Sequence, residues 1–348
     1  MVSHSATSNV HDLVVIGASA GGVETLRNVV SGLPADLPAA VCVVLHIAPS
    51  SPSALARILD RAGPLPCRTA SDGAELRLGT IVVAPPDRHL VVEGTHARLT
   101  VGPRENGHRP SADVLFRSAA TSRDGRVLGV VLSGTRDDGA AGLAAIKAAG
   151  GAAIVQDPAD ALYGGMPENA LQRVAPDAVV RSDQVAATVV AIVKGERLPE
   201  DPDVVGAGQA GPATERGTTT VCPECGGVLS ERLETGVLQW ECRVGHRYSP
   251  DSLLDAQGQA VEATLWAAIR ALEDRVMLLE RMEEQVPSAP GADAAQALHK
   301  RARRAIEQAR MVRGALELSA SDTRRDELFR EPAATGGEPH DRGDGEAG

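Results

Sequence analysis

The sequence predicts an α/β protein with a doubly wound, mostly parallel sheet, a small zinc-ribbon-like module and a C-terminal helical hairpin. Three observations support this prediction. Short apolar segments alternate with helical segments over residues 11–195, which is typical of a parallel sheet. Three cysteines and a histidine gather within residues 222–246. Two long segments with helical periodicity follow them.

The composition agrees with this fold class and excludes several kinds of protein. Hydrophobic residues make up 43% of the 348 residues but aromatic residues only 2%, so the core must consist of Ala, Val, Leu and Ile. The net charge of −11 argues against nucleic-acid binding, which needs clustered Lys and Arg. Neither a membrane span nor a signal peptide is recognisable. We therefore expect a cytoplasmic protein that inserts into no membrane.

Changes in composition divide the chain into five predicted parts. The α/β domain covers 11–195, a Pro/Gly-rich linker 196–220, the cysteine-bearing module 221–249 and the helical hairpin 250–318. The tail at 331–348 is rich in Gly, Glu, Asp and Pro and has no periodicity, so we expect it to be disordered.

The elements of the α/β domain follow from its periodicity. Strands are expected at Leu13–Ile16, Ala40–Leu45, Thr80–Ala84, Val127–Leu132 and Ala152–Gln156. Helices are expected at Val23–Val30, Ser53–Arg61, Ser111–Ala120 and Ala140–Ala149. An antiparallel hairpin is expected from His89–Val92 and Ala97–Val101.

The first strand ends in Gly17-Ala18-Ser19-Ala20-Gly21, and a helix follows. Ser19 is therefore predicted to lie in a tight turn, where backbone N–H groups at the helix start can bind an anion. The spacing fits the G-x-S-x-G nucleophile elbow but neither the dinucleotide-binding nor the P-loop pattern. Glycines that serve only helix–strand packing are an alternative that the turn alone leaves open.

His46 and the pair Asp137-Asp138 follow two other predicted strands. Because ligand sites of open parallel sheets lie outside the carboxyl ends of the strands, these side chains are expected beside Ser19. A serine nucleophile needs a histidine base and a carboxylate that orients it. Alternatively, His46 is a structural histidine, and one aspartate caps the helix that follows Gly139. The order Ser–His–Asp differs from that of the α/β-hydrolases.

Residues 11–190 resemble the catalytic domain of the bacterial chemotaxis methylesterases, the CheB family. The matching segments are Ile16–Gly22, Leu45-His46, Ala84–Leu90, His108–Phe116, Leu132–Leu143, Gln156-Asp157 and Gly165–Pro167. The resemblance implies that Ser19 is the nucleophile, His46 the general base and acid, and Asp138 the orienting carboxylate. It also implies hydrolysis of glutamate γ-methyl esters on chemoreceptor helices, with release of methanol, and deamidation of receptor glutamines in some members. No cofactor is implied for catalysis.

Two features depart from the family pattern. The family usually carries a methionine where Thr135 stands, in a segment whose backbone helps to form the oxyanion hole. The usual receiver domain is not recognisable before the first strand. We therefore expect an enzyme that is always open or is controlled elsewhere in the chain.

The cysteine-bearing module has the spacing of a metal site. Cys222 and Cys225 form one close pair, and Cys242 and His246 form a second. Two such pairs separated by a short hairpin predict a tetrahedral Cys₃His site that holds a structural Zn²⁺.

Both C-terminal helices carry apolar residues at alternating steps of four and three. The first seam is Leu265, Ile269, Leu272, Val276 and Leu279, and the second is Leu298, Ala302, Ala305, Ala309, Val312 and Leu316. Small residues on the second seam favour a close antiparallel hairpin. The pair could dimerise, dock on a receptor bundle, a chemotaxis kinase or another array protein, or cover the esterase cleft, and the sequence leaves these roles and the oligomeric state open.

Taken together, the sequence predicts a protein-glutamate methylesterase with a zinc-stabilised C-terminal module. One alternative is a binding scaffold of a signalling array that recognises receptors with little turnover. A second alternative is an esterase that acts on small molecules. Methanol release from a methylated receptor distinguishes the first alternative, and small p-nitrophenyl esters distinguish the second.

Overall fold

The computed structural model describes residues 11–49, 53–196, 214–286 and 292–328. The chain divides into two units, residues 1–257 and 258–348. The predicted disordered tail at 331–348 and most of the predicted linker lie outside the described residues. The predicted fold class is confirmed: a parallel sheet with helices is followed by the cysteine-bearing module, which is built from strands, and by two long helices.

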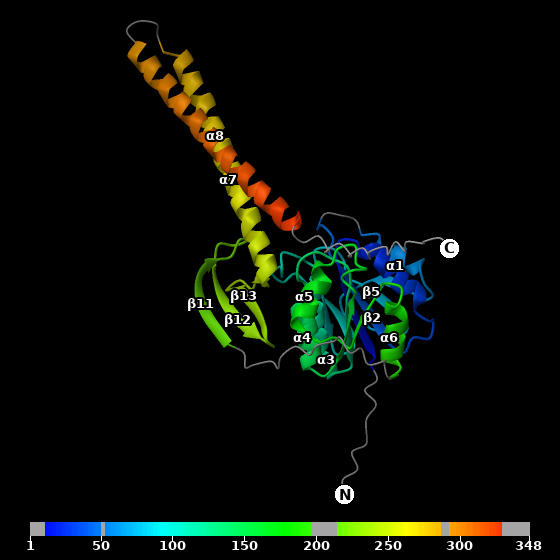
Figure 1. Ribbon diagram of the computed structural model, residues 1–348. Helices are drawn as coiled ribbons and strands as arrows, with labels where there is room; N and C mark the ends of the chain where they lie inside the picture. The colour runs from blue at the N-terminus through cyan, green and yellow to red at the C-terminus, as the bar shows by residue number, and fades with distance from the viewer. Residues whose placement is uncertain (1–10, 50–52, 197–213, 287–291, 329–348) are drawn as a thin grey trace, which may run out of the picture. The chain divides into compact units, whose positions relative to one another are not determined.

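A parallel seven-stranded sheet forms the centre of the first unit (Figure 1). Its strands are, in spatial order, β10 (Ala178–Val180), β9 (Ala152–Gln156), β8 (Val127–Val131), β1 (Leu13–Ala18), β2 (Ala40–Leu45), β5 (Ile81–Val83) and β3 (Cys67–Thr69). All six residues of β1 and of β2 are buried, as their apolar sequences require in a sheet that is covered on both faces. The sheet runs from β1 to β2 on one side and to β8 on the other, which makes it doubly wound.

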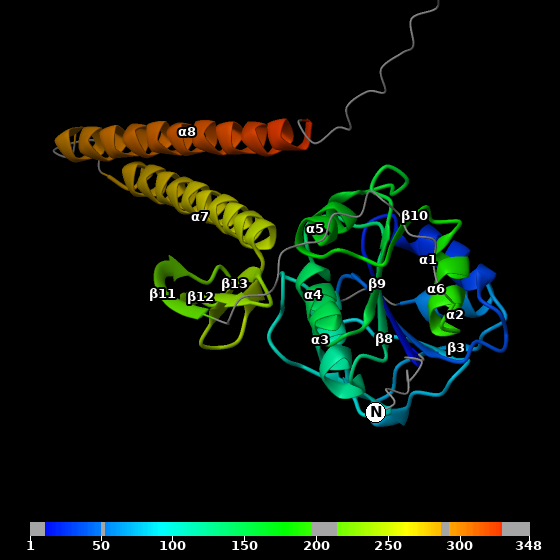
Figure 2. The same cartoon turned by 60° about the horizontal axis from the view of Figure 1, so that its bottom comes forward.

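Helices cover both faces of this sheet (Figure 2). Apolar residues on one face pack with α1 (Gly22–Gly32), α2 (Leu55–Asp60) and α6 (Val185–Val193). The opposite face packs with α3 (Ala112–Arg123), α4 (Ala140–Ala148) and α5 (Gly165–Arg173). The two cores consist almost entirely of Ala, Val, Leu and Ile, in agreement with the low aromatic content.

A smaller antiparallel sheet combines one strand that precedes β5 with a hairpin in the connection between β5 and α3. It contains β4 (Ala74–Glu75), β6 (His89–Glu93) and β7 (His96–Thr100). Strands β6 and β7 form the predicted hairpin.

The cysteine-bearing module is a four-stranded antiparallel sheet. Its strands are β11 (Thr214–Val221), β12 (Val228–Glu234), β13 (Val237–Cys242) and β14 (Arg247–Tyr248). The predicted linker is therefore wrong at its C-terminal end, because residues 214–220 belong to β11. Their threonines suit a strand, and pairing with β12 outweighs the weak local tendency of this segment to form a linker.

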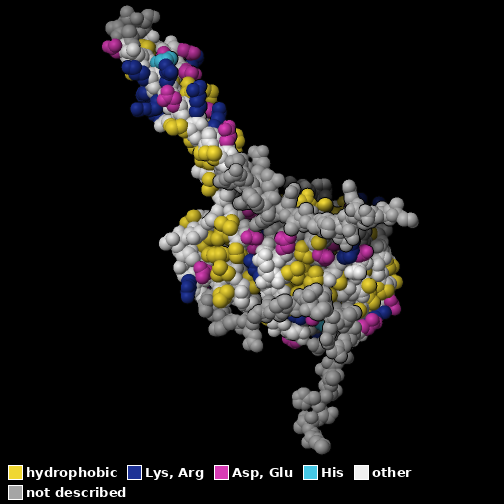
Figure 3. Space-filling model, in the orientation of Figure 1, with side chains coloured by type: hydrophobic (Ala, Val, Ile, Leu, Met, Phe, Trp, Pro, Cys, Tyr) yellow, Lys and Arg dark blue, Asp and Glu magenta, His cyan; other side chains and the backbone are white. Residues whose placement is uncertain are grey.

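Two helices, α7 (Pro250–Glu284) and α8 (Ala292–Leu328), follow the module. Within the second unit they run antiparallel, since Glu283 lies 3.4 Å from His299 and Glu273 pairs with Arg313. The predicted seams are confirmed, because Ile269, Leu279, Ala302, Ala305 and Ala309 are the buried residues. The outer surfaces carry interspersed charges of both signs (Figure 3).

The predicted end of the second helix, at residue 318, is wrong. Helix α8 continues to Leu328 although the apolar period stops, because its last ten residues contain no Gly or Pro to end it.

None of the described helices is apolar over a stretch long enough to cross a membrane.

Candidate active site

Ser19 occupies the turn between β1 and α1. The strand is buried through Ala18, and α1 begins at Gly22. Gly21 has a φ of +73°, a left-handed conformation that glycine adopts without strain. A Cβ atom on Gly22 would lie 2.7 Å from that of Ala18, so the sharp turn also needs glycine there. The sequence thus folds locally into the predicted turn and presents Ser19 at the edge of the sheet.

His46 follows β2, the parallel neighbour of β1. Leu45 pairs in register with Ala18, so the residues that come next, His46 and Ser19, emerge side by side. His46 Nδ1 lies 3.0 Å from Ser19 Oγ. His46 Nε2 lies 2.6 Å from Asp138 Oδ2.

Asp138 follows β8, which is the other neighbour of β1. Three adjacent strands, β8, β1 and β2, therefore bring together the three residues predicted as the catalytic set, at the edge where ligands bind in such sheets. In this arrangement the Asp138 carboxylate accepts a hydrogen bond from the Nε2–H group of His46. The unprotonated Nδ1 can then accept a hydrogen bond from the Ser19 hydroxyl. The geometry is that of a nucleophile, a base and an orienting carboxylate.

The Asp138 carboxylate is buried and has five hydrogen-bond donors. Besides His46, these are Ser111 Oγ at 2.8 Å, Asn106 Nδ2 at 2.9 Å, and the backbone amides of Ala112 and Asp113 at 2.7 and 3.2 Å. Burial alone would raise the pKa of Asp138, but the hydrogen bond and charge of His46 and the Ala112 amide hold it well below its usual range. Asp138 is therefore ionised at neutral pH.

A second buried carboxylate, Asp113, lies next to Asp138. Its Oδ1 accepts the amides of Gly139 and Gly142 at 3.0 and 2.6 Å, at the beginning of α4. Burial and the neighbouring Asp138 raise the pKa of Asp113 to about 7. The alternative prediction that Asp137 or Asp138 caps α4 with its side chain is therefore wrong; Asp113 from α3 satisfies these amides.

Asp137 contacts the beginning of α7. Its Oδ1 accepts the Ser252 hydroxyl at 2.5 Å, and its Oδ2 accepts the Asp251 amide at 3.3 Å. Arg173 Nη2 lies 3.7 Å from the same carboxylate. Asp137 is completely buried, so these partners replace the water that its charge has lost.

His108 is a site residue that sequence reasoning did not single out. Its ring stacks on that of His46, with 3.7 Å between the ring centroids and 9° between the planes. Burial and the proximity of His46 lower the pKa of His108 to about 3, so it is neutral. Its position in the segment His108–Phe116, which carries the family resemblance, was the signal that could have identified it.

The segment after β8 passes close to Ser19. A Cβ atom on Gly134 would lie 2.8 Å from Ser19 Cβ and 2.1 Å from Met166 Sδ, so only glycine allows this approach. The backbone N–H of Ser19 donates a hydrogen bond to the Ser133 carbonyl, and that of Gly134 donates one to the Tyr163 carbonyl. Throughout the described part of the chain, no acceptor is found for the amides of Ala20 and Thr135.

The four predicted metal ligands gather in the module. Their ligand atoms all lie within 4.8 Å of one another. His246 Nδ1 is 3.7 Å from Cys222 Sγ and 3.5 Å from Cys242 Sγ, and Cys225 Sγ is 3.6 Å from Cys242 Sγ. A zinc tetrahedron has S···N edges of about 3.6 Å and S···S edges of about 3.8 Å, and these three distances are close to those edges.

Other contacts also suit a metal site. His246 Nε2 faces the Glu224 carboxylate at 3.2 Å, which is how a carboxylate commonly orients a ligating imidazole. Burial acts to raise the pKa of the Cys242 thiol, but hydrogen bonds from the His246 and Val244 amides and from neighbouring side chains lower it to about 7. The donor set is the one expected for a closed structural Zn²⁺ site.

Comparisons with known proteins agree on the first half of the chain. Residues 14–189 match the family profile described as CheB methylesterase. Protein-glutamate methylesterase/protein-glutamine glutaminase 3 of Anaeromyxobacter dehalogenans is 43% identical over 176 residues, which are 50% of this chain and 52% of that protein. A putative protein-glutamate methylesterase/protein-glutamine glutaminase of Leptospira interrogans is 35% identical over 51% of this chain and 92% of its own.

A solved structure matches the same region. The crystal structure of the Thermotoga maritima CheB methylesterase catalytic domain aligns with a TM-score of 0.50 and 30% identity, over 52% of this chain and 98% of that one. The chain spans about half the length of the Anaeromyxobacter relative and of a Methanosarcina mazei relative.

Proposed function

Because this chain belongs to the CheB methylesterase family, we propose that it is a serine hydrolase that removes methyl groups from glutamate γ-methyl esters on chemoreceptors. The observation that carries this proposal is the series of contacts from Ser19 Oγ to His46 Nδ1 at 3.0 Å and from His46 Nε2 to Asp138 at 2.6 Å. Such a series activates a hydroxyl for attack on an ester carbonyl.

The proposed reaction has two steps. Ser19 Oγ attacks the ester carbonyl carbon while His46 Nδ1 takes the hydroxyl proton, and His46 returns that proton to the departing methoxide, so that methanol leaves. Water then attacks the glutamyl ester of Ser19, with His46 again as the base, which releases the glutamate carboxylate and restores the Ser19 hydroxyl. The ionised Asp138 stabilises the imidazolium in both steps.

Backbone amides would stabilise the oxyanion of each tetrahedral intermediate. The Ala20 amide, which follows the nucleophile, and the Thr135 amide are the proposed donors, because both are unpaired in the described chain and the segment of Gly134 runs against Ser19. Loss of one such donor costs roughly 3–4 kcal/mol of transition-state stabilisation. A backbone donor does not depend on the side chain at position 135, so a threonine there is compatible with the role.

Deamidation of receptor glutamines is a second activity of the same site. The names of the curated relatives include protein-glutamine glutaminase. The same attack on a glutamine carbonyl would release ammonia in place of methanol, with His46 protonating the leaving nitrogen. A helical receptor segment is the proposed partner for both activities, and a chemotaxis kinase or another array protein is a further proposed partner.

Methanol release from a methylated receptor fragment tests the proposed esterase. We expect turnover by the full chain and a loss of at least about 10⁴-fold in kcat for Ser19→Ala, because the nucleophile is removed. Ser230→Ala, on strand β12, is the matched control and should keep full turnover. Receptor binding without methanol release would support the scaffold alternative. Hydrolysis of small p-nitrophenyl esters alone would support an esterase for small molecules.

For the Cys₃His cluster we propose a structural Zn²⁺ held by Cys222, Cys225, Cys242 and His246. The close fit of the four ligand atoms supports this proposal, as does the apolar cluster of Leu229, Tyr248 and Leu253 that packs around the ligands. The metal has no part in the proposed chemistry. Thiolate ligands of this kind persist in a reducing compartment, which is the basis for the proposed cytoplasmic location.

A further inference from the structure

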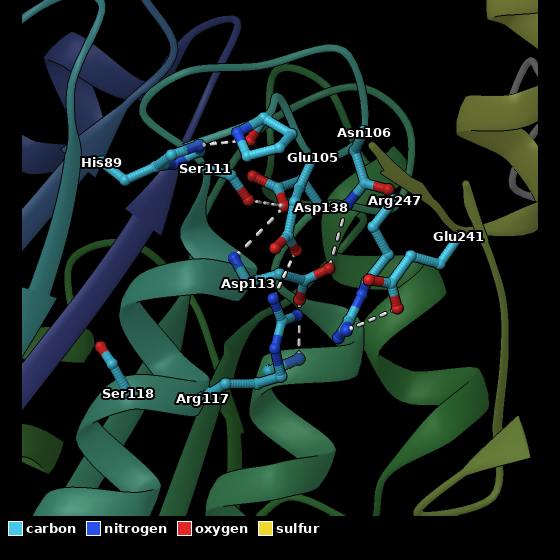
Figure 4. A network of polar contacts seen from close by, with 12 residues as sticks. His89, Glu105, Asn106, Ser111, Asp113, Arg117, Ser118, Asp138, Glu241 and Arg247 are labelled. Carbon is cyan, nitrogen blue, oxygen red and sulfur yellow. Dashed lines mark hydrogen bonds and ion pairs between the residues drawn. The ribbon is translucent and has the colours of Figure 1, made fainter. Parts of the chain in front are cut away.

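The cysteine-bearing module is connected to the triad aspartate by a single buried side chain, Asn106. Figure 4 shows Asn106 beside Asp138 and Asp113, near Arg247 of the module. Asn106 is 2% exposed and donates through Nδ2 to Asp138 Oδ1 and to Asp113 Oδ2, both at 2.9 Å. Its Oδ1 accepts the backbone amide of Ser249 at 2.9 Å and the Ser249 hydroxyl at 2.8 Å.

These contacts determine which way the Asn106 amide points. A backbone N–H can only donate, so the Ser249 amide requires the oxygen of Asn106 on the side of the module. The NH₂ group must then face the two carboxylates. The opposite orientation would place the side-chain oxygen against two buried acceptors and leave the backbone amide of Ser249 without a partner, which is unfavourable for buried groups.

The backbone around Asn106 is held by the module as well. The backbone N–H of Asn106 donates to the Arg247 carbonyl at 2.8 Å, and the backbone N–H of Arg247 donates to the Arg104 carbonyl at 3.4 Å. Asn106 itself has a φ of +54°, which asparagine tolerates better than most residues. His246, one of the proposed metal ligands, directly precedes Arg247.

Ser249 is placed by the start of α7. It precedes Pro250, the first residue of the helix, and its carbonyl accepts the Leu253 amide at 2.9 Å. Ser and Pro at these positions are typical of a helix N-terminus. Ser249 and Ser252 are each 1% exposed, so their hydrogen bonds to Asn106 and Asp137 lie away from solvent.

We propose that Asn106 is a positioning residue for Asp138 and that the module, through Ser249, holds Asn106 in the working orientation. The module is then a component of the esterase site, and its removal or displacement lowers turnover. This inference rests on the proposed esterase function. It disfavours the alternative in which the module inhibits the site.

Three variants of the full chain test the inference. Asn106→Gly keeps the left-handed φ and removes the amide, so we expect kcat to fall about 10- to 100-fold with KM unchanged, as for a misplaced catalytic group. Ser249→Ala keeps the backbone donor and loses the hydroxyl, and we expect a smaller fall of about 3- to 10-fold. Ser230→Ala is the matched control and should leave kcat unchanged.

Asn106→Asp gives a readout that a purely structural role would not move. An aspartic acid donates to Asp138 only while protonated, so the ratio of its kcat to that of the wild type should fall as the pH rises from about 5 to about 8. If Asn106→Gly does not fold, Ser249→Ala and Asn106→Asp still test the inference. A constant ratio, with Ser249→Ala within twofold of the wild type, would overturn it.

A spectroscopic readout separates this inference from the proposed substrate. The 2.6 Å hydrogen bond from His46 Nε2 to Asp138 should give a far-downfield proton resonance in wild-type protein and in Ser230→Ala. We expect that resonance to shift upfield or disappear in Asn106→Gly. If the wild type releases no methanol while this change occurs, only the substrate assignment fails. An unchanged resonance in a folded Asn106→Gly protein contradicts the inference itself.

Discussion

At the scale of residues, the site separates the protonation states of two neighbouring carboxylates. Asp138 and Asp113 share the NH₂ group of Asn106, yet their pKa values move in opposite directions. Asp138 has His46 as a partner and a pKa well below its usual range, whereas burial beside Asp138 raises that of Asp113 to about 7. Such a separation keeps the charge on the carboxylate that contacts His46, the proposed base.

His108 gives a pH-dependence prediction at this scale. The unfolded chain protonates His108 near pH 6.5, but the folded protein does so only near pH 3. Between these values the unfolded state binds the additional proton, so the free energy of unfolding falls as the pH drops. We expect His108→Phe, which keeps an aromatic ring on His46, to lose less stability than the wild type between pH 7.5 and about 4.5.

Urea denaturation at the two pH values measures this difference. His96→Phe is the matched control, because His96 is exposed and its replacement should leave the pH dependence as in the wild type. Equal pH dependence for His108→Phe and the wild type would contradict a neutral, buried His108.

At the scale of elements, the site depends on how closely the segment after β8 approaches the turn after β1. Gly134 makes this approach possible, and its carbonyl accepts the Met166 amide at 2.9 Å at the beginning of α5. Strand order brings Ser19 and His46 together, whereas the two proposed oxyanion donors, the Ala20 and Thr135 amides, lie on the two loops that meet in this contact.

Gly134→Ala should therefore reduce both stability and reactivity. The added methyl group would meet Met166 and Ser19, so we expect a loss of about 1–3 kcal/mol in unfolding free energy and at least a tenfold slower labelling of Ser19 by a fluorophosphonate. Gly217→Ala is the control, since nothing lies within 4 Å of its added Cβ. Thermal unfolding and labelling rates that match the wild type would show that the approach is not tight.

At the scale of the whole molecule, metal binding is predicted to support the α/β domain as well as the module. Two of the proposed ligands, Cys222 and Cys242, share an apolar cluster with Leu229, Tyr248 and Leu253. Tyr248 directly precedes Ser249, which donates hydrogen bonds to Asn106. Metal binding adds its free energy to the folding of a small sheet that has few apolar residues of its own.

Cys222→Ser should abolish stoichiometric zinc binding and increase amide hydrogen exchange over residues 228–248. Mass spectrometry of the native protein measures the metal, and hydrogen exchange measures the module. Cys67→Ser replaces a half-buried cysteine of β3 and should retain one zinc ion per chain. Full zinc content in Cys222→Ser would contradict the proposed ligand set.

The sequence by itself determined the features that depend on local pattern. Alternating apolar and helical segments predicted the sheet, strand ends predicted that Ser19, His46 and one of Asp137 and Asp138 would meet, and the cysteine spacing predicted the cluster. Each of these features follows from residues close together in the chain, or from the general rule that parallel strands end at one edge.

Only the tertiary structure decided the partners of the buried polar groups. Local pattern could not assign Asp138 to His46 and Asp137 to α7, nor identify Asp113 as the cap of α4. Asn106 and Ser249 are separated by 143 residues, and the backbone N–H of Ser249 donates a hydrogen bond to the side-chain oxygen of Asn106. Such partners are chosen when folding removes water from groups that must still form hydrogen bonds, so they depend on which distant segments become neighbours.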